Sequence, residues 1–199
     1  ERITKIAETQ SFDCTVEAKI DGVACSLVYA DGQLKIGKTR GDGTTGDNVT
    51  ANVRTIRSIP FVLDKPINAE IRGEVYMPYK TLCKLNENLE SEGEKTLANP
   101  RNAAAGALKL QDPEQCSLKG LEFIAYFVEG ELFNKFHSHN IQELRNLGFP
   151  VNPFLRKCPT IEEIFSAIDE LQSLRDTFEF DIDGAVIKTD RVHHITKMP

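Results

Sequence analysis

EAKIDG, at residues 17–22, spaces its charged residues two apart, which is the repeat of a β-strand. Because successive strand side chains point to opposite faces, Glu17, Lys19 and Asp21 share one face and the apolar residues between them share the other. The charged face carries a carboxylate, an amine and a second carboxylate. Solvated charges on a half-exposed strand are the simplest interpretation, and the rest of the sequence decides whether a stronger one is justified.

A second stretch of the same kind lies near the end of the chain. FDIDGAVIK, at residues 180–188, again joins an Asp-Gly pair to a lysine in a two-residue repeat. Alternation places Val186 with Lys188 on one face and Ala185 with Ile187 on the other. We expect the two lysine-bearing strands to face each other across a cleft. Taken alone, lysine, aspartate and glycine at this spacing form a weak motif, because all three residues are common.

Composition places the chain among ordinary globular proteins. It has 199 residues, of which 40% are hydrophobic and 27% are charged. No run approaches the roughly 18 consecutive apolar residues of a membrane span, and the start, ERITKIAETQ, lacks the basic and apolar regions of a signal peptide. We therefore expect a soluble, cytoplasmic protein with no membrane partner.

Cysteine usage and net charge narrow the possible partners. The five cysteines are widely spaced and include no CxxC pair, so we interpret them as reduced thiols rather than as zinc ligands or a redox motif. The formal net charge of −6 opposes binding to nucleic acid through phosphate contacts. A DNA partner would have to be gripped by a local basic patch or by other domains.

The pattern of elements predicts an α+β fold. Asp31-Gly32 predicts a type I′ hairpin, residues 68–77 predict a major strand, and LEFIAYFVEG at residues 121–130 predicts a strand that we expect to be central. Helices are expected after Asp47 or Asn48, after Pro78, over residues 101–110, after a cap at Ser138 or Asn140, and after Thr160 with Ile161, Ile164, Ile168 and Leu171 on its apolar stripe. No regular βαβ repeat indicates a doubly wound sheet.

The HSH sequence offers a possible metal site. His137 and His139 have no obvious partner in the sequence, and both fall at the predicted start of a helix. We favour capping or solvent exposure over metal binding for this pair.

Five stretches, in order along the chain, identify a family resemblance: EAKIDG, TRGDGTTGDNVTANVRTIRSIP, RGEVYMP, NPRNAAAGALK and FDIDGAVIK. Together they resemble the nucleotidyltransferase (adenylation) domain of bacterial NAD-dependent DNA ligases, and the matches run from Glu17 to Lys188. The first and last stretches also resemble ATP-dependent ligases and capping enzymes. RGDGTTG and NPRNAAAG are similar only to the NAD-dependent family.

The resemblance implies a nucleotidyltransferase (ATP-grasp-like) fold, in which two antiparallel β-sheets surround a nucleotide cleft with flanking helices. Residues 1–199 would form one truncated adenylation domain. It would lack the N-terminal segment that recognises nicotinamide and the C-terminal OB, zinc-finger, helix-hairpin-helix and BRCT regions. We accordingly expect the isolated chain to bind the adenosine part of NAD but to react poorly with it.

The resemblance also implies a reaction. Lys19 would attack the α-phosphate of NAD, release nicotinamide mononucleotide and hold AMP, which then passes to the 5′-phosphate of a nick before the 3′-hydroxyl seals it. Lys188 would contact the transferred phosphate, where a positive charge stabilises the transition state. NAD and Mg²⁺ (or Mn²⁺) are the implied cofactors, nicked double-stranded DNA is the partner of the full-length enzyme, and the protein is expected to be a monomer.

Other residues take roles from the same resemblance. Glu17 would read the adenine edge, Arg40 and Glu74 would hold the ribose, and Tyr126 would stack on adenine with Val186 opposite it. Core packing is the alternative for Tyr126.

Acidic and basic residues complete the predicted site. Asp21 and Asp183 would either orient Lys19 or bind Mg²⁺ through water, and the metal ligands stay unassigned. Arg101, Lys109 and Arg175 match basic positions near the nucleotide phosphates or the DNA backbone, although relatives usually carry arginine where this chain has Lys109. We expect the RGDGTTGD loop mainly to position Arg40.

Two other functions share parts of this pattern. An ATP- or GTP-dependent RNA ligase or capping nucleotidyltransferase uses the same lysine chemistry. A non-catalytic nucleotide-binding or protein-interaction module needs neither a nucleophile nor a second phosphate-directed cation, so the presence of both Lys19 and Lys188 argues against it.

Overall fold

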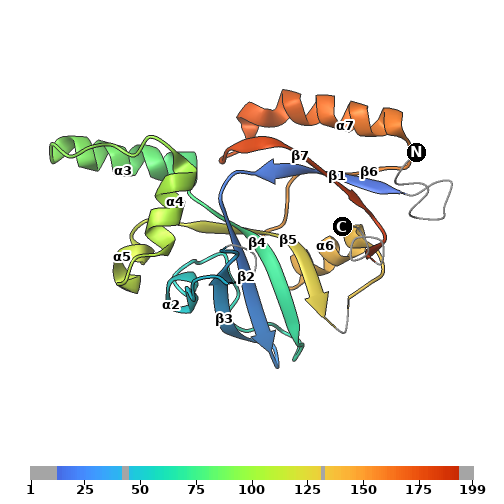
Figure 1. The fold of residues 1–199 in the computed structure, drawn as a ribbon, viewed down its shortest axis with the longest axis horizontal. Coiled ribbons are helices and arrows are strands. Elements are labelled where there is room, and N and C mark those ends of the chain that lie inside the picture. The colour runs from blue at the N-terminus through green and yellow to red at the C-terminus, as the bar shows by residue number, and fades with distance from the viewer. Residues whose placement is uncertain (1–12, 42–44, 131–132, 193–199) are drawn as a thin grey trace.

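The computed structural model describes residues 13–41, 45–130 and 133–192, which form two antiparallel β-sheets with helices around them (Figure 1). The start of the chain and positions 42–44 of the RGDGTTGD loop lie outside the described residues. The small sheet has the order β6-β1-β7 and contains β1 (Cys14–Ile20), β6 (Leu155–Cys158) and β7 (Ile182–Thr189). The large sheet has the order β3-β2-β4-β5 and contains β2 (Val23–Ala30), β3 (Gln33–Thr39), β4 (Ala69–Tyr76) and β5 (Glu122–Gly130).

Helices cover the sheets or project from them. They are α2 (Thr50–Val53), α3 (Tyr79–Ser91), α4 (Pro100–Leu108), α5 (Pro113–Ser117), α6 (His137–Asn146), α7 (Ile161–Leu174) and a 3₁₀ turn, η1 (Arg175–Thr177). The predicted α+β class with two antiparallel sheets is confirmed. Among the described residues, no helix has both the length and the apolar character that crossing a membrane requires.

The strand that carries EAKIDG is the central strand of the small sheet. β1 pairs with β6 on one side and with β7 on the other, and Glu17 lies opposite Val186 in the β7 register. The two lysine-bearing strands are therefore neighbours in one sheet, and our expectation that they face each other across a cleft is wrong. Neighbouring antiparallel strands bring their side chains within about 5 Å, so this pairing gathers the charged side chains of both strands on one surface.

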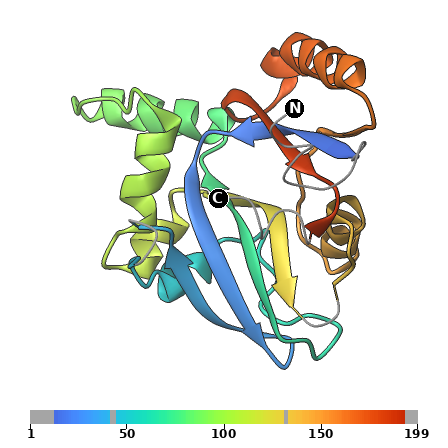
Figure 2. The same ribbon diagram turned by 45° about the vertical axis from the view of Figure 1, so that its right-hand side comes forward.

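The Asp21-Gly22 turn carries the chain from the small sheet into the large one (Figure 2). A Cβ atom on Gly22 would lie 2.4 Å from the carbonyl oxygen of Val75 and 2.9 Å from Cγ of Glu74. Only glycine lets the turn approach β4 this closely. The glycine of the motif therefore sets how closely the two sheets approach.

The predicted hairpin is confirmed. Asp31 and Gly32 join β2 to β3 with φ angles of 50° and 71°, so both central residues have the positive φ of a type I′ turn.

β5 lies at the edge of the large sheet, so our expectation of a central strand is wrong. Its apolar sequence reflects burial on both faces. Phe123 and Ala125 belong to the large core, whereas Ile124 belongs to the core of the small sheet. α6 packs against β5 on the side away from β4 (Figure 1). An edge strand can thus have buried residues on both of its faces.

Two helix starts differ from the predictions. α2 is a single turn with Val49 at its N-cap, although Asn48 Oδ1 still accepts a hydrogen bond from the Thr50 amide at 3.1 Å. α6 begins two residues earlier than a Ser138 cap predicts and four earlier than an Asn140 cap predicts, with Phe136 at its N-cap and no side-chain cap from either residue. The carboxylate of Asp190, from the end of β7, accepts the Ser138 amide at 2.7 Å instead.

Other helix predictions hold. α3 follows Pro78, and α4 begins at Pro100 after Asn99, whose side chain accepts from the Asn102 amide. α7 is capped by Thr160 and covers the small sheet. Its stripe is narrower than predicted, because Ile161 is 61% exposed.

The two sheets have separate cores. Residues of the large sheet, α2, α4 and α6 form one cluster, and residues of the small sheet, α7 and the segments next to them form the second. α3 contributes no fully buried residue and extends to one side with α4 and α5 (Figure 1). The space between the sheets is left open for a site.

Two phenylalanines test the small core. Phe154 is 2% exposed and packs between the small sheet and α7, whereas Phe165, on the outer face of α7, is 62% exposed. Phe154→Ala should lower the free energy of unfolding by about 3–5 kcal/mol, because it removes buried contacts and leaves a cavity. Phe165→Ala is the matched control and should change it by less than about 0.5 kcal/mol. Urea denaturation measures both, and equal losses would contradict the assignment of this core.

Candidate active site

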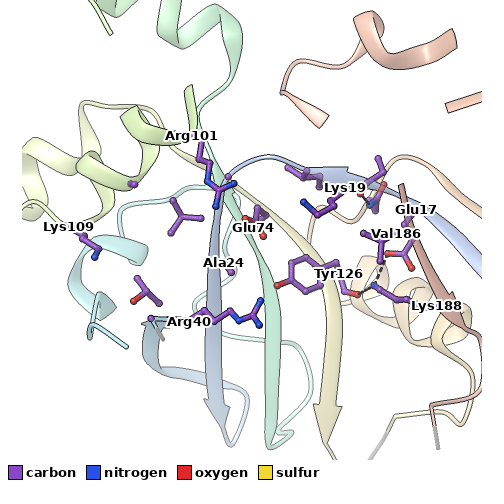
Figure 3. Close-up of a pocket in the computed structure, with 18 residues that line it drawn as sticks. Glu17, Lys19, Ala24, Arg40, Glu74, Arg101, Lys109, Tyr126, Val186 and Lys188 are labelled. Atoms are coloured by element: carbon purple, nitrogen blue, oxygen red, sulfur yellow. Dashed lines mark hydrogen bonds and ion pairs between the residues drawn. The ribbon is translucent and has the colours of Figure 1, made fainter. Parts of the chain in front are cut away.

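A cleft of about 670 Å³ lies between the two sheets and α4 (Figure 3). Its lining includes nine of the residues predicted from the sequence: Glu17, Lys19, Arg40, Glu74, Arg101, Lys109, Tyr126, Val186 and Lys188. The structure brings these residues together from five strands or the loops next to them and from α4. Their individual roles stay predictions.

One end of the cleft is aromatic and apolar. Tyr126, on β5, and Val186, on β7, line this end, and Tyr126 belongs to neither buried core cluster. Burial raises the pKa of the Tyr126 hydroxyl to about 12, so it stays protonated. A ring that lines a cleft in this way fits the stacking role better than the core-packing alternative.

Lys188 lies at this same end, beside Glu17 (Figure 3). Its Nζ donates to Glu17 Oε2 at 3.0 Å and to the backbone oxygen of Tyr126 at 3.2 Å, and it lies 5.4 Å from the centroid of the Tyr126 ring. Its predicted contact with the transferred phosphate stays a prediction. Lys188 neighbours the residue predicted to read the base.

Glu17 is almost completely buried, at 1% exposure. Burial alone would raise the pKa of its carboxyl, but the hydrogen bond from His137 and the charge of Lys188 outweigh burial and lower the pKa below its usual range. The interpretation of EAKIDG as a strand of solvated charges is consequently wrong for Glu17. A buried carboxylate that keeps its charge needs partners of this kind.

His137 is buried beside Glu17, although the sequence analysis favoured helix capping or solvent exposure for it. It is 1% exposed, and its Nε2 lies 2.6 Å from Glu17 Oε1. Neither helix capping nor solvent exposure describes it, whereas His139, two residues later, is only partly buried and packs on the Phe136 ring. No local signal could have revealed the contact, because 120 positions separate the two residues.

Lys19 projects from β1 into the cleft between the aromatic end and the basic end (Figure 3). Its Nζ lies 2.5 Å from Asp183 Oδ2, and both side chains are partly exposed. Asp183 directly precedes Gly184, which is the register partner of Lys19 on β7. Of the two aspartates predicted to orient Lys19, Asp183 makes the contact.

Asp21 has a different partner. Its Oδ1 lies 2.8 Å from Nη1 of Arg101, in the first turn of α4. The ion pair links the end of β1 to the helix on the other side of the cleft. Asp21 is thus paired with Arg101, and its predicted roles stay predictions.

Arg101 and Lys109 occupy the end of the cleft opposite Tyr126, whereas Arg40 reaches from the end of β3 towards Tyr126 (Figure 3). Arg40 follows β3 and is exposed, and its backbone amide donates to Ala24 at 3.1 Å. Lys109, just after α4, pairs with Asp47 at 2.7 Å. Together with Arg101 they form a surface that suits anionic groups.

Arg175 lies outside the cleft. It is part of η1 and lines a separate depression together with Tyr79, at the start of α3, and Asp181, just before β7. The structure therefore does not bring Arg175 to the other predicted site residues. Its predicted contact with phosphates or the DNA backbone stays untested.

Glu74 is a second carboxylate of the cleft lining whose pKa is shifted. Burial raises its pKa to about 7, and the positive charges of Arg101 and Lys19 only partly oppose this effect. Asp21 and Asp183 add negative charge nearby and raise the pKa further. Near neutral pH, Glu74 is therefore a mixture of its protonated and ionised forms.

The acidic residues do not form a metal cage. Among residues 13–41, 45–130 and 133–192, no group of three or more histidine, cysteine, aspartate or glutamate side chains could hold an ion. Asp21 and Asp183 are each engaged by a cation of the protein. A Mg²⁺ ion here would need ligand oxygens from elsewhere, such as phosphates and water.

The two antiparallel sheets with their surrounding helices form the nucleotidyltransferase fold that is found in DNA ligases. Two solved structures share this fold: one named "Pmar-Lig_Pre." has a TM-score of 0.56 at 11% identity and covers 94% of this chain and 40% of its own. The other is a mycobacterial DNA ligase D complexed with ATP and MES, with a TM-score of 0.50 at 14% identity, covering 90% of this chain and 49% of its own. At this identity, the likeness shows the fold alone.

Sequence comparison then gives the family. The NAD-dependent DNA ligase adenylation domain family matches residues 1–198, and the chain belongs to it. The DNA ligase of Natranaerobius thermophilus is 44% identical over 191 residues, which are 94% of this chain and 29% of that protein. The DNA ligase of Listeria innocua is 43% identical over 196 residues, with 98% and 29% coverage.

A third relative, the DNA ligase of Anoxybacillus flavithermus, is 47% identical over 176 residues, which are 87% of this chain and 26% of that protein. The chain thus spans less than a third of the length of the curated relatives it matches. The resemblance inferred from the five sequence stretches is confirmed.

The raised pKa of Glu74 predicts a pH-dependent stability. Between its ordinary pKa of 4.5 and the folded value of about 7, the folded state binds more protons than the unfolded state, so stability should fall as pH rises through this window. The decrease is at most about 3 kcal/mol by the energy of a pKa shift. Glu74→Gln removes the titrating group, and its free energy of unfolding should therefore change less between pH 5 and pH 8.

Urea denaturation across that pH range measures the effect. Glu87→Gln, on an exposed position of α3, is the control and should keep the pH profile of the wild type. An unchanged profile in Glu74→Gln would show that Glu74 is not the group responsible.

Proposed function

We propose that this domain accepts AMP from NAD on Lys19, as the first step of DNA ligation by a longer protein. The observation that carries the proposal is the placement of Lys19 in a cleft that has an aromatic, base-sized end on one side and a basic end on the other. Such a cleft can hold the base and the phosphate of one nucleotide on either side of the amine. Membership of the NAD-dependent family supports NAD as the donor.

In the proposed step, Nζ of Lys19 forms a bond to the α-phosphorus of NAD. The bond from this phosphorus to the bridging oxygen breaks, nicotinamide mononucleotide leaves with the bonding electrons, and the amine loses its proton. An amine attacks only when it is unprotonated, and free lysine has a pKa near ~10.4. Asp183, at 2.5 Å, orients the amine, and Arg101 lies where it can offset the charge of the phosphate.

The base end of the cleft suits adenine. Its 6-amino group is a hydrogen-bond donor and N1 is an acceptor, and these complement the carboxylate of Glu17 and the ammonium of Lys188. Tyr126 and Val186 would hold the two faces of the ring. We therefore assign Lys188 to the base end, in place of the phosphate contact expected from the sequence.

The ribose and the metal complete the proposal. Arg40 and Glu74 line the cleft between its two ends and would hold the sugar hydroxyls. Mg²⁺ or Mn²⁺ would be held mainly by phosphate oxygens, with Asp21 and Asp183 contributing through water. The metal supplies additional positive charge to the reacting phosphate.

Transfer of AMP to a nick is proposed for the whole protein. The net charge of −6 gives this domain little attraction for DNA of its own, so regions present in the longer relatives would supply most of the binding. Arg101 and Lys109 at the basic end are the candidates for contact with the 5′-phosphate, with Arg175 as a more distant contact.

Lys19 is the first test of this proposal. In the longer ligase that contains this domain, Lys19→Ala should abolish the addition of AMP, because the variant lacks the amine to which AMP is proposed to be attached. Intact-protein mass spectrometry after incubation with NAD and Mg²⁺ measures the addition. Lys35→Ala, in the hairpin strand β3, is the control and should label as the wild type does.

Separate incubations with ATP and with GTP distinguish an NAD-dependent enzyme from the related RNA ligases and capping enzymes. Equal labelling of Lys19→Ala and wild type would show that another residue is the nucleophile.

A second test asks whether the ammonium of Lys188 contacts the base or the phosphate of the bound nucleotide. Lys188→Ala should weaken binding of adenosine and of AMP by the same factor, about tenfold for the loss of a charged hydrogen bond. A lysine that contacts the phosphate would instead affect AMP and leave adenosine binding unchanged. Titration calorimetry with both ligands gives the answer, again with Lys35→Ala as the control.

A further inference from the structure

His137 lies beneath the base end of the cleft, yet it is not among the residues that line it. It is the first residue of α6, and its side chain is almost completely buried. The 2.6 Å contact between its ring and Glu17 joins two side chains that are each 1% exposed. A buried histidine on a buried carboxylate is costly unless the hydrogen bond is well formed.

Two groups lie close to Nε2 of His137: Glu17 Oε1 at 2.6 Å and Lys188 Nζ at 3.5 Å. The contact with Glu17 is much the shorter, so it decides whether Nε2 carries a proton. Three side chains contact the carboxylate of Glu17. Thr15 Oγ1 lies 3.3 Å and His137 Nε2 lies 2.6 Å from Oε1, and Lys188 Nζ lies 3.0 Å from Oε2. A lone pair on Nε2 would face the carboxylate oxygen and repel it at this distance. We therefore place a proton on Nε2, which makes all three groups donors to an ionised Glu17.

The backbone around His137 fixes its ring. Its amide donates to the Asp190 backbone oxygen at 2.6 Å, and the Asp190 carboxylate accepts from the Ser138 amide at 2.7 Å and from the Ser138 hydroxyl at 3.0 Å. Asp190 is buried and follows Lys188 by two residues. One end of β7 thus holds both the start of α6 and the lysine that contacts Glu17.

We propose that His137 is a positioning residue that keeps Glu17 a pure hydrogen-bond acceptor, and that it thereby gives the cleft its preference for a 6-aminopurine over a 6-oxopurine. The proposal rests on the function proposed above, in which adenosine occupies this end of the cleft. His137 acts through Glu17 and does not touch the base.

The chemistry of the base edge explains the preference. An ionised carboxylate offers only lone pairs, which suit the 6-amino group of adenine and repel the 6-oxo group of hypoxanthine. A protonated carboxyl offers a donor as well and can accept the 6-oxo group. The lowered pKa of Glu17, which the His137 hydrogen bond helps to produce, agrees with a carboxylate that stays ionised.

Binding of AMP and of inosine monophosphate to the full chain tests the proposal by titration calorimetry. His137→Leu fills a similar volume without a donor and should reduce the AMP preference about tenfold, the effect of one charge-assisted hydrogen bond. His137→Gln places an amide N–H near the position of Nε2 and should keep the preference within about threefold of the wild type. His139→Leu, two residues along α6, is the matched control and should bind as the wild type does.

The outcomes separate the two proposals. A wild-type chain that binds neither nucleotide, or binds both equally, would overturn the proposed function itself. A wild type that prefers AMP, together with a His137→Leu variant that loses affinity for both nucleotides by the same factor, would show that His137 only supports the fold. Failure of His137→Gln to restore the preference would also overturn the positioning role.

A second measurement does not depend on the folding of a variant. Nitrogen-15 NMR of the histidine side chains in the wild-type protein identifies the tautomer of His137 directly. A proton on Nε2 is expected, both free and with AMP bound. A neutral ring with its proton on Nδ1 would overturn the proposal.

Discussion

The charge of Glu17 is the constraint on which the site depends. A carboxylate removed from water must be neutralised or hydrogen-bonded, or the fold loses several kcal/mol, roughly the whole stability of many domains. Here the required donors come from three places in the chain: Thr15 on the same strand, His137 at the start of α6, and Lys188 on β7. Folding correctly and assembling the base end of the cleft are therefore one event.

The same constraint explains why the small sheet has its particular composition. β1 is central, so its backbone is hydrogen-bonded on both sides, and its alternate residues serve two environments. Val16 and Ala18 pack beneath α7, whereas Glu17 and Lys19 face the cleft, one fully buried and one half-exposed. A shift of one residue in register would reverse these faces, so the strand order and the charged repeat support each other.

Local patterns in the sequence were sufficient for most of the helices and strands, but not for the cleft. The Asp31-Gly32 hairpin and the Asn99 cap of α4 depend on a few neighbouring residues, which is why both could be predicted. The edge position of β5 and the burial of His137 depend on contacts between segments far apart in the chain, which no local repeat encodes. Family resemblance supplied the residues that line the cleft, but it could not place Lys188 beside Glu17.

The position of Lys19 on a central strand limits how far any attached group can travel. The backbone of β1 at this point is held by β7 on one side, and on the other the Ala18 backbone oxygen accepts from the side-chain Nδ2 of Asn152 at 2.7 Å. Only the side-chain torsions of Lys19 remain free to rotate. An AMP group attached to Lys19 as proposed could therefore move only within the length of this side chain, and the 5′-phosphate of a DNA nick would have to approach it.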